Sequence, residues 1–201
     1  QSSGPPLDGL RVLEITNGPP GQIAGMLFAD LGADVVRLVH ADSIEPPIGD
    51  LPAWLCWNRG KTLAVADGDT NRLLARADVV LHDLHPEQRS AEGFDAETVR
   101  TRFPALVDIW LAPIAATGRW AELPGDQLLL DAVSGFAAHH PASVERPVAS
   151  AVATRHPVQG ALAVTAAMSA LIGRDSDGHG RSATISGLHA EAATLATLVS
   201  R

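Results

Sequence analysis

The sequence is poor in lysine and has no concentration of basic residues. Lys61 is the one lysine among 15 Lys and Arg residues, so the other 14 are arginines. They are scattered along the 201 residues, and the formal net charge is −8 at pH 7. Because no basic patch is present to meet phosphates, we do not expect nucleic acid as a partner.

Cysteine and long apolar runs are equally scarce. Cys56 is the single cysteine, which excludes a disulfide within the chain. The first residues lack the basic start and apolar stretch of a secretory signal, so we expect a cytoplasmic protein. The longest apolar run, residues 160–173, is too short and too rich in small residues to cross a bilayer. We therefore expect a buried helix there and no membrane partner.

Strand-like and helix-like segments alternate along a chain that is 46% hydrophobic. Residues 10–16 form a β-rich apolar run, the turn NGPPG follows, and a helical pattern leads to Gly32 and a second strand at 34–39. The helix connects the two strands with few additional residues, which favours a parallel pair of strands joined by a right-handed crossover. We predict an α/β fold: a Rossmann-like, open, mostly parallel sheet with helices on both faces.

The rest of the chain continues this alternation. Further strands are predicted at 62–66, 78–84, 105–112 and 181–187. Further helices are predicted at 71–77, 96–103, 126–139, 157–172 and 188–200, and loops at 40–60 and 141–155. We interpret residues 1–6 as a tail or processing remnant and residues 7–201 as one domain.

Glycines at the first strand-to-helix turn raise the question of dinucleotide binding. Gly18, Gly21 and Gly25 have the spacing G-x-x-G-x-x-x-G rather than G-x-G-x-x-G. The second strand ends in Val39-His40, where an acidic residue would bind ribose, so NAD is not favoured. The alternative is that these glycines allow a tight turn and close helix packing.

Histidines raise the question of a metal site. His82 and His85 flank Asp83, but side chains three apart at a strand end point to opposite faces, and no third ligand is evident. We interpret this segment as a solvated loop and predict no metal. The pair His139-His140 is a weaker candidate.

Two residues have a local context that suits chemistry. Asn58 and Gly60 favour a turn after which Lys61 projects at the start of a strand, where its ammonium can meet a phosphate. His156 precedes Pro157 near a helix N-cap, where the helix dipole favours a neutral imidazole able to act as a base. The alternatives are an exposed lysine and an ordinary capping or solvent-facing histidine.

Five segments of the chain together form a family pattern. They are LDGLRVLEIT (7–16), GMLFADLGADVVRLV (25–39), NRGKTLAV (58–65), residues 77–107 and GRDSDGHGRSATIS (173–186). In order and spacing they resemble the class III CoA-transferase family, which includes formyl-CoA transferase, the carnitine and bile-acid CoA-transferases and α-methylacyl-CoA racemase. The resemblance implies a Rossmann-like large domain that binds coenzyme A, in dimers that interlock as rings.

The resemblance also implies the residues that contact CoA. Lys61 stands where the family's lysine helps to hold the CoA nucleotide, and Arg59 and Asn58 match the same motif. Further candidate contacts are Pro19 in the turn after the first strand, His40 after the second strand and Asp83 after the fourth. CoA or acyl-CoA is the expected substrate or ligand, and no tightly bound cofactor is expected.

The reactive positions depart from the family. The family has a reactive aspartate, which is acylated in the transferases and moves a proton in the racemases. The corresponding position in this chain, four residues before Gly160, is His156. Where racemases have a histidine before a helix, this chain has Asp126. A carboxylate forms a mixed anhydride with a thioester, whereas an acylated imidazole is prone to hydrolysis. His156 therefore does not suit ordinary CoA transfer, but α-proton abstraction by His156 and Asp126 is chemically reasonable.

Family members also carry a second, small domain that completes the active site across the dimer. We expect it to be absent from residues 7–201, which leaves two hypotheses. The first is an acyl-CoA-handling protein that needs a complementary chain, in a homo- or hetero-oligomer. The second is a degenerate, non-catalytic subunit used for complex assembly or regulation.

Overall fold

The computed structural model describes residues 4–39, 51–65, 70–139, 146–148, 150 and 153–199. Its strands are β1 (Arg11–Ile15), β2 (Asp34–Val39), β3 (Thr62–Val65), β4 (Val79–His82), β5 (Val107–Trp110) and β6 (Ser182–Thr184). They form one six-stranded sheet in the order β3-β2-β1-β4-β5-β6, and every neighbouring pair is parallel. The prediction of an open parallel sheet is confirmed.

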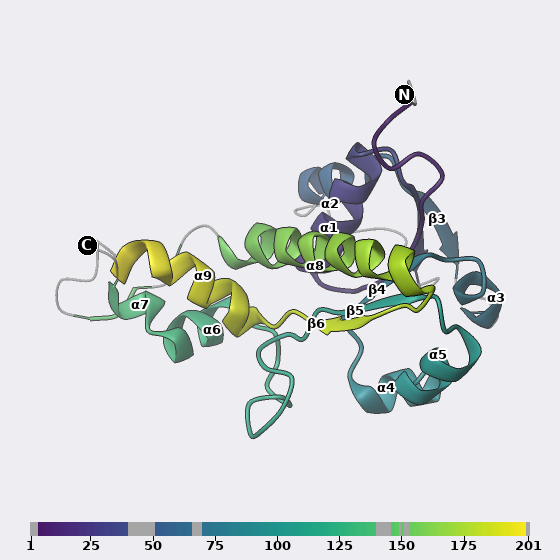
Figure 1. Ribbon diagram of the computed structural model, residues 1–201. Coiled ribbons are helices and arrows are strands. Elements are labelled where there is room, and N and C mark those ends of the chain that lie inside the picture. Colours follow the sequence, from purple (N-terminus) through teal and green to yellow (C-terminus); the bar gives the residue numbers. More distant parts are fainter. Residues whose placement is uncertain are drawn as a thin grey trace.

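Helices cover both faces of the sheet, as predicted, and a third group lies beyond the carboxyl ends of the strands (Figure 1). One face carries α1 (Pro19–Asp30), α2 (Leu51–Asn58) and α8 (Arg155–Asp177). The other face carries α3 (Thr70–Leu74), α4 (Pro86–Ala91) and α5 (Ala96–Arg102). The third group consists of α6 (Gln127–Ser134), α7 (Phe136–His139) and α9 (Gly187–Val199).

Two apolar clusters, one on each face of the sheet, form the core. Val12 of β1 packs with residues of α1 and α8, whereas its neighbour Leu13 packs with Leu74 of α3 and Val99 of α5. Successive side chains of a strand point to opposite faces, so burial on both faces requires strands that are apolar throughout. This is the pattern from which the fold was predicted.

A glycine lets α8 approach α1. A Cβ on Gly160 would lie 2.9 Å from the carbonyl oxygen of Pro20 and 3.2 Å from the backbone nitrogen of Ala24. Further along α8, Ala163 and Ala167 are fully buried in the apolar cluster that also contains Val12. These small residues hold the first turn of α8 beside the start of α1, where several candidate residues lie.

Three helices differ from the prediction. The expected loop at 40–60 contains α2 in its described part, because its proline, Pro52, falls in the first helical turn, where proline is tolerated. The short α4 was not predicted and begins at Pro86 for the same reason. The expected helix at 126–139 is split by Gly135, whose φ of 83° ends α6.

The long small-residue helix begins earlier than predicted. Its N-cap is Thr154 and its first residue is Arg155, so His156 lies inside the first turn rather than at the cap. Within the described ranges, no helix combines the length and the apolar character that a membrane span needs.

Candidate functional site

The strand order reverses between β1 and β4, and ligands of open α/β sheets bind at such a point, beyond the carboxyl ends of the strands. Here Asp83, which follows β4, meets the turn that follows β1. Its Oδ2 accepts hydrogen bonds from the backbone N–H groups of Asn17 at 2.8 Å and Gly18 at 2.7 Å. Burial raises the pKa of Asp83, although the two N–H groups favour its carboxylate form.

A cavity of about 200 Å³ lies at this point of the sheet. Its walls come from the start of α1, the residues after β4 and β5, the segment before α6 and the first turns of α8. The lining residues are Gly18, Pro19, Pro20, Gly21, Asp83, Leu111, Pro113, Gly125, Arg155 and Gln159. Two of the predicted CoA contacts, Pro19 and Asp83, therefore share one cavity.

Arg155 joins two walls of this cavity. Its Nη1 donates to the carbonyl oxygen of Pro113 at 3.1 Å, and its Nη2 donates to that of Gly125 at 3.0 Å. Its Nε donates to Oε1 of Gln127 at 3.1 Å. The side chain is almost completely buried, and burial lowers the pKa of Arg155. Arg155 thus fixes the segment before α6 against the first turn of α8.

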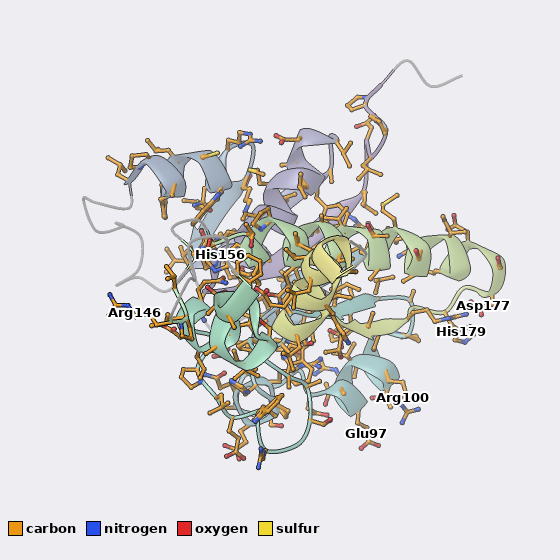
Figure 2. All side chains as sticks on the ribbon, turned by 90° about the vertical axis from the view of Figure 1, so that its left-hand side faces the viewer. Glu97, Arg100, Arg146, His156, Asp177 and His179 are labelled. Carbon is orange, nitrogen blue, oxygen red and sulfur yellow. The ribbon has the colours of Figure 1, made fainter. Side chains whose placement is uncertain are left out.

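His156 is half-buried beside this arginine. Arg155 Nη2 lies 3.1 Å from His156 Nε2, and a guanidinium can only donate, so Nε2 accepts the hydrogen bond. Burial, and then the positive charge of Arg155, lower the pKa of His156 to about 4. In Figure 2, His156 lies toward the middle of the molecule, whereas Asp177 and His179 lie at its margin. A neutral imidazole is favoured, although by burial and Arg155 rather than by the predicted position at a helix N-cap, and its Nε2 is already engaged.

Asp126 is exposed and caps a helix. Its side chain accepts a hydrogen bond from the backbone N–H of Leu129 at 3.0 Å, in the first turn of α6. No hydrogen bond or ion pair among the described residues joins Asp126 to His156. The proposed acid–base pair therefore stays a prediction.

The side chain of Lys61, immediately before β3, is buried. Its Nζ lies 2.6 Å from Glu14 Oε2 on β1 and 2.7 Å from the carbonyl oxygen of Gln22 on α1. The side chains of Lys61 and Glu14 both have 0% exposed surface. The alternative of an exposed lysine is wrong, because protein oxygens already surround the ammonium. A contact with the CoA nucleotide stays a prediction.

Arg37 and Asn58 extend this buried network. Arg37 Nε lies 3.2 Å from Glu14 Oε1, and its Nη1 donates to Asn58 Oδ1. Asn58 Nδ2 in turn donates to the carbonyl oxygen of Trp54 at 2.8 Å, within α2. Burial raises the pKa of Glu14 and lowers the pKa of Lys61, while the attraction between the two charges acts in the opposite direction.

The glycines of the first turn serve close packing. A Cβ on Gly21 would lie 2.3 Å from Cγ2 of Thr16, and a Cβ on Gly25 would lie 2.0 Å from Oε2 of Glu14. These distances leave no room for any side chain. They support the packing interpretation that was offered against dinucleotide binding.

Another predicted CoA contact, Arg59, lies away from the cavity. Arg59 is at the surface, where its Nη2 pairs with Asp30 Oδ2 at 2.5 Å and its Nη1 donates to the carbonyl oxygen of Cys56 at 2.9 Å. His40 is outside the described residues. The predicted contacts therefore divide between the cavity, the buried network and the surface.

The interpretation of His82 as part of a solvated loop is wrong. His82 is the last residue of β4 and is fully buried, with Nε2 3.1 Å from Asp108 Oδ1. Arg89 of α4 holds the other carboxylate oxygen of Asp108 at 2.9 Å. His85 is the N-cap of α4, and its backbone N–H donates to the side chain of Gln88. Among the described residues, no group of three His, Cys, Asp or Glu is placed to hold a metal.

Four residues of these networks were not predicted: Glu14, Arg37, Arg155 and Gln159. Glu14 and Arg37 are charged residues inside apolar strands, and this interruption was the available sequence signal. Arg155 and Gln159 carried no comparable signal, because their roles depend on carbonyl groups far away in the chain.

Comparisons with known proteins agree with this architecture. A model of CoA-transferase family III matches residues 7–200. A protein of Agrobacterium fabrum named succinate–glutarate CoA-transferase is 29% identical over 219 aligned positions, gaps included, and the match covers 96% of this chain and 53% of that protein. A Mycobacterium tuberculosis protein named "Probable fatty acyl-CoA transferase" is 29% identical over 192 residues, which cover 86% of this chain and 48% of that protein.

A solved structure supports the same conclusion. The crystal structure of a CAIB/BAIF family protein from Brucella suis has a TM-score of 0.87 and 27% sequence identity, and the match covers 98% of this chain and 57% of that one. This chain spans about half the length of the curated relatives described above. Because the family model matches nearly all of its residues, the chain belongs to CoA-transferase family III.

Proposed function

We propose that this chain binds a CoA thioester and supplies one half of an acyl-CoA-handling enzyme, the other half coming from a complementary chain. The observation that carries the proposal is the cavity at the reversal of strand order, where Asp83 and the first turn of α8 meet. The names of the relatives, which are CoA-transferases, support a thioester as ligand.

The predicted contacts suggest how CoA lies. Pro19 and Asp83 line the cavity, so we place the pantetheine arm there. Of the two cations among the predicted contacts, Arg59 is the more accessible to the nucleotide, because 46% of its side chain is exposed, against 0% for Lys61. Lys61 could reach a phosphate only by leaving Glu14 and Gln22, so in this proposal it holds the start of β3 in place.

The reaction needs a group beyond those described. His156 has a pKa of about 4, and a general base works best with a pKa near the operating pH. We therefore propose that α-proton chemistry or acyl transfer takes a catalytic group from the complementary chain. The setting would be a cytoplasmic homo- or hetero-oligomer with free CoA thioesters as substrates and no resident cofactor.

A second function is favoured by the same histidine. Arg155 occupies the acceptor nitrogen of His156, and Asp126 serves as a helix cap. If His156 and Asp126 have structural roles only, the chain could act as a non-catalytic subunit that assembles or regulates a complex. This function predicts copurification with a catalytic family member and unchanged turnover when His156 is replaced.

Thermal denaturation with CoA and acetyl-CoA tests the binding that the first function requires. A ligand present at 100 times its Kd stabilises the folded state by about 2.7 kcal/mol. Absence of any shift in melting temperature at saturating concentrations would overturn the binding proposal. Turnover by the complex formed with the copurified chain then separates catalysis from assembly.

A further inference from the structure

Two buried carboxyl groups meet where α6 packs against α9, in the helical group beyond the carboxyl ends of the strands (Figure 1). Asp131 of α6 and Glu191 of α9 are each 1% exposed. One amide joins them, because Nε2 of Gln127 donates to Asp131 Oδ1 and, at 3.4 Å, to Glu191 Oε1. Burial and a neighbouring negative charge both oppose the ionisation of a carboxyl group. The arrangement therefore favours a state in which one of the two keeps its proton.

Arg155 fixes the orientation of this amide. Its Nε donates to Gln127 Oε1 at 3.1 Å, and a guanidinium has no atom that accepts. The oxygen of the amide therefore faces Arg155, and its NH₂ group faces the two carboxyl groups. The guanidinium also brings one positive charge to the network, which balances one carboxylate and not two. Charge balance thus agrees with one ionised and one protonated carboxyl group.

The hydrogen bonds indicate that Glu191 holds the proton. Asp131 has a donor on each oxygen, the Gln127 amide on Oδ1 and the backbone N–H of Ser150 on Oδ2 at 3.4 Å. Glu191 shares only the Gln127 amide, and no described residue donates to its buried Oε2. Donors stabilise an ionised carboxylate, so ionisation is harder at Glu191. Burial raises the pKa of Glu191 and the charge of Asp131 adds to this effect, while Gln127 and Arg155 act in the opposite direction.

We propose that the carboxyl group of Glu191 is a proton-dependent switch, which holds α9 against α6 while it is protonated and loosens this contact when it is ionised. Ionisation would add a second negative charge to a buried contact, so the helices would have to separate until water reaches it. Among the described residues, the charged groups that face Glu191 are Asp131 from α6 and Arg155 from α8. On α9 itself, the nearest titratable residue in sequence is His189, whose Nδ1 accepts the backbone N–H of Ser186.

The switch lies beside the cavity at the reversal of strand order. Gln127, which joins the two carboxyl groups, also accepts from Arg155, and Arg155 holds the carbonyl oxygen of Gly125 in the cavity wall. Loosening of α6 would therefore reach this wall. That consequence concerns ligands only through the proposed CoA function, whereas the switch itself does not depend on that function.

Hydrogen exchange of the full chain between pH 5 and pH 8, without CoA, tests the switch. A carboxyl group whose pKa is raised by folding contributes stability that is lost as the pH rises through the raised pKa. After correction for the intrinsic exchange rate at each pH, protection of α6 and α9 should fall as the pH rises, by about tenfold if folding raises the pKa by one. The first turn of α8 should follow, because Arg155 contacts Gln127, and α1 should not.

Variants assign the effect to one residue. Glu191→Gln resembles the protonated group in shape and cannot ionise, so α9 should stay protected up to pH 8. Asp131→Asn keeps an oxygen for Gln127 but removes the neighbouring negative charge, so the fall in protection should be smaller than in wild type. Glu97→Gln is the matched control and should behave as wild type, because Glu97 is 80% exposed on α5 (Figure 2). His156 contributes with the opposite sign and is present in all three variants, so its effect cancels in the comparison.

Carbon-13 NMR of the glutamate carboxyl groups in wild type is a second readout that does not need a folded variant. One resonance should titrate above the ordinary value of 4.5, and if none does the switch is overturned. Equal protection of α9 at pH 5 and pH 8 overturns it as well, and so does a pH dependence that Glu191→Gln retains. Loss of the pH dependence in Glu97→Gln would assign the effect to overall charge and overturn the switch. None of these results requires CoA, so failure of the proposed function is seen separately.

Discussion

Arg155 donates a hydrogen bond to the ring of its neighbour, with Nη2 3.1 Å from Nε2 of His156. The bond requires the imidazole proton to be on Nδ1, because Nε2 must accept. The positive charge of Arg155 adds to the effect of burial, and together they lower the pKa of His156 to about 4. Arg155 therefore sets the tautomer of His156, the predicted catalytic residue, and acts together with burial to keep its imidazole neutral.

This relationship predicts a loss of stability in acid. The pKa of His156 is about 4 in the folded chain against an ordinary value of 6.5, so the unfolded chain binds more protons between these pH values. The free energy of unfolding should fall as the pH is lowered through this window and level off below it. The loss is at most about 3 kcal/mol. Urea denaturation of wild type and His156→Gln between pH 7 and pH 4 measures it.

His179→Gln is the matched control for this experiment. His179 is exposed and lies just beyond the other end of α8, so its replacement removes an imidazole without touching Arg155 (Figure 2). The slope of stability against pH should flatten in His156→Gln and not in His179→Gln. Equal slopes in wild type and His156→Gln would contradict the assignment.

The buried pair of Lys61 and Glu14 predicts a large loss of stability on replacement. Lys61→Met leaves the Glu14 carboxylate buried with Arg37 as its remaining cation. Breaking a buried pair by removing one partner costs about 3–5 kcal/mol, and we expect the lower end because Arg37 stays. Equilibrium denaturation by urea measures the change.

Two further variants separate burial from charge. Arg59→Ala breaks a pair with Asp30 in which both side chains are more than 40% exposed, so we expect a much smaller loss. The double variant Glu14→Gln/Lys61→Met should regain part of the stability lost by Lys61→Met, because it removes the charge left without its partner. If Lys61→Met and Arg59→Ala were equally mild, the buried pair would not be a stabilising contact.

The sheet could be predicted from sequence because its signal is local. Val12, Val35 and Val107 stand in short apolar runs separated by turns and helical patterns, and each is buried as strands covered on both faces must be. The right-handed crossover rule then constrains how such units connect. No long-range contact had to be known for this step.

The site could not be predicted in the same way, because its partners are distant in the sequence. Lys61 meets Glu14 across 47 residues, and Arg155 meets Pro113 across 42. A lysine after a glycine turn has the same local sequence whether it is exposed or buried. Whether the Lys61 side chain is exposed or buried depends on how β1, α1 and the start of β3 pack together. The local sequence does not contain this information, so the alternative of an exposed lysine was wrong.

Close packing around the same pair predicts that Gly25→Ala is destabilising. Its Cβ would lie 2.0 Å from Glu14 Oε2 and 3.0 Å from Lys61 Nζ, so the buried pair would have to move. Gly173→Ala in α8 is the control, because nothing lies within 4 Å of the added Cβ. In a helix interior that change should stabilise by about 0.5–1 kcal/mol. Thermal melts that rank both variants alike would contradict the packing.

Asp126 allows its structural role to be separated from a catalytic one. The side chain caps α6 through the backbone N–H of Leu129, and asparagine caps as well as aspartate does. Asp126→Asn should therefore keep the free energy of unfolding, whereas Asp126→Ala should lose about 1 kcal/mol. Urea denaturation measures both. The catalytic role is tested in a reconstituted complex that exchanges the α-proton of an acyl-CoA. If the Asp126 carboxylate takes part in proton transfer, Asp126→Asn should exchange the proton slowly while its free energy of unfolding is unchanged. Full exchange activity in Asp126→Asn would leave Asp126 with the role of a helix cap alone.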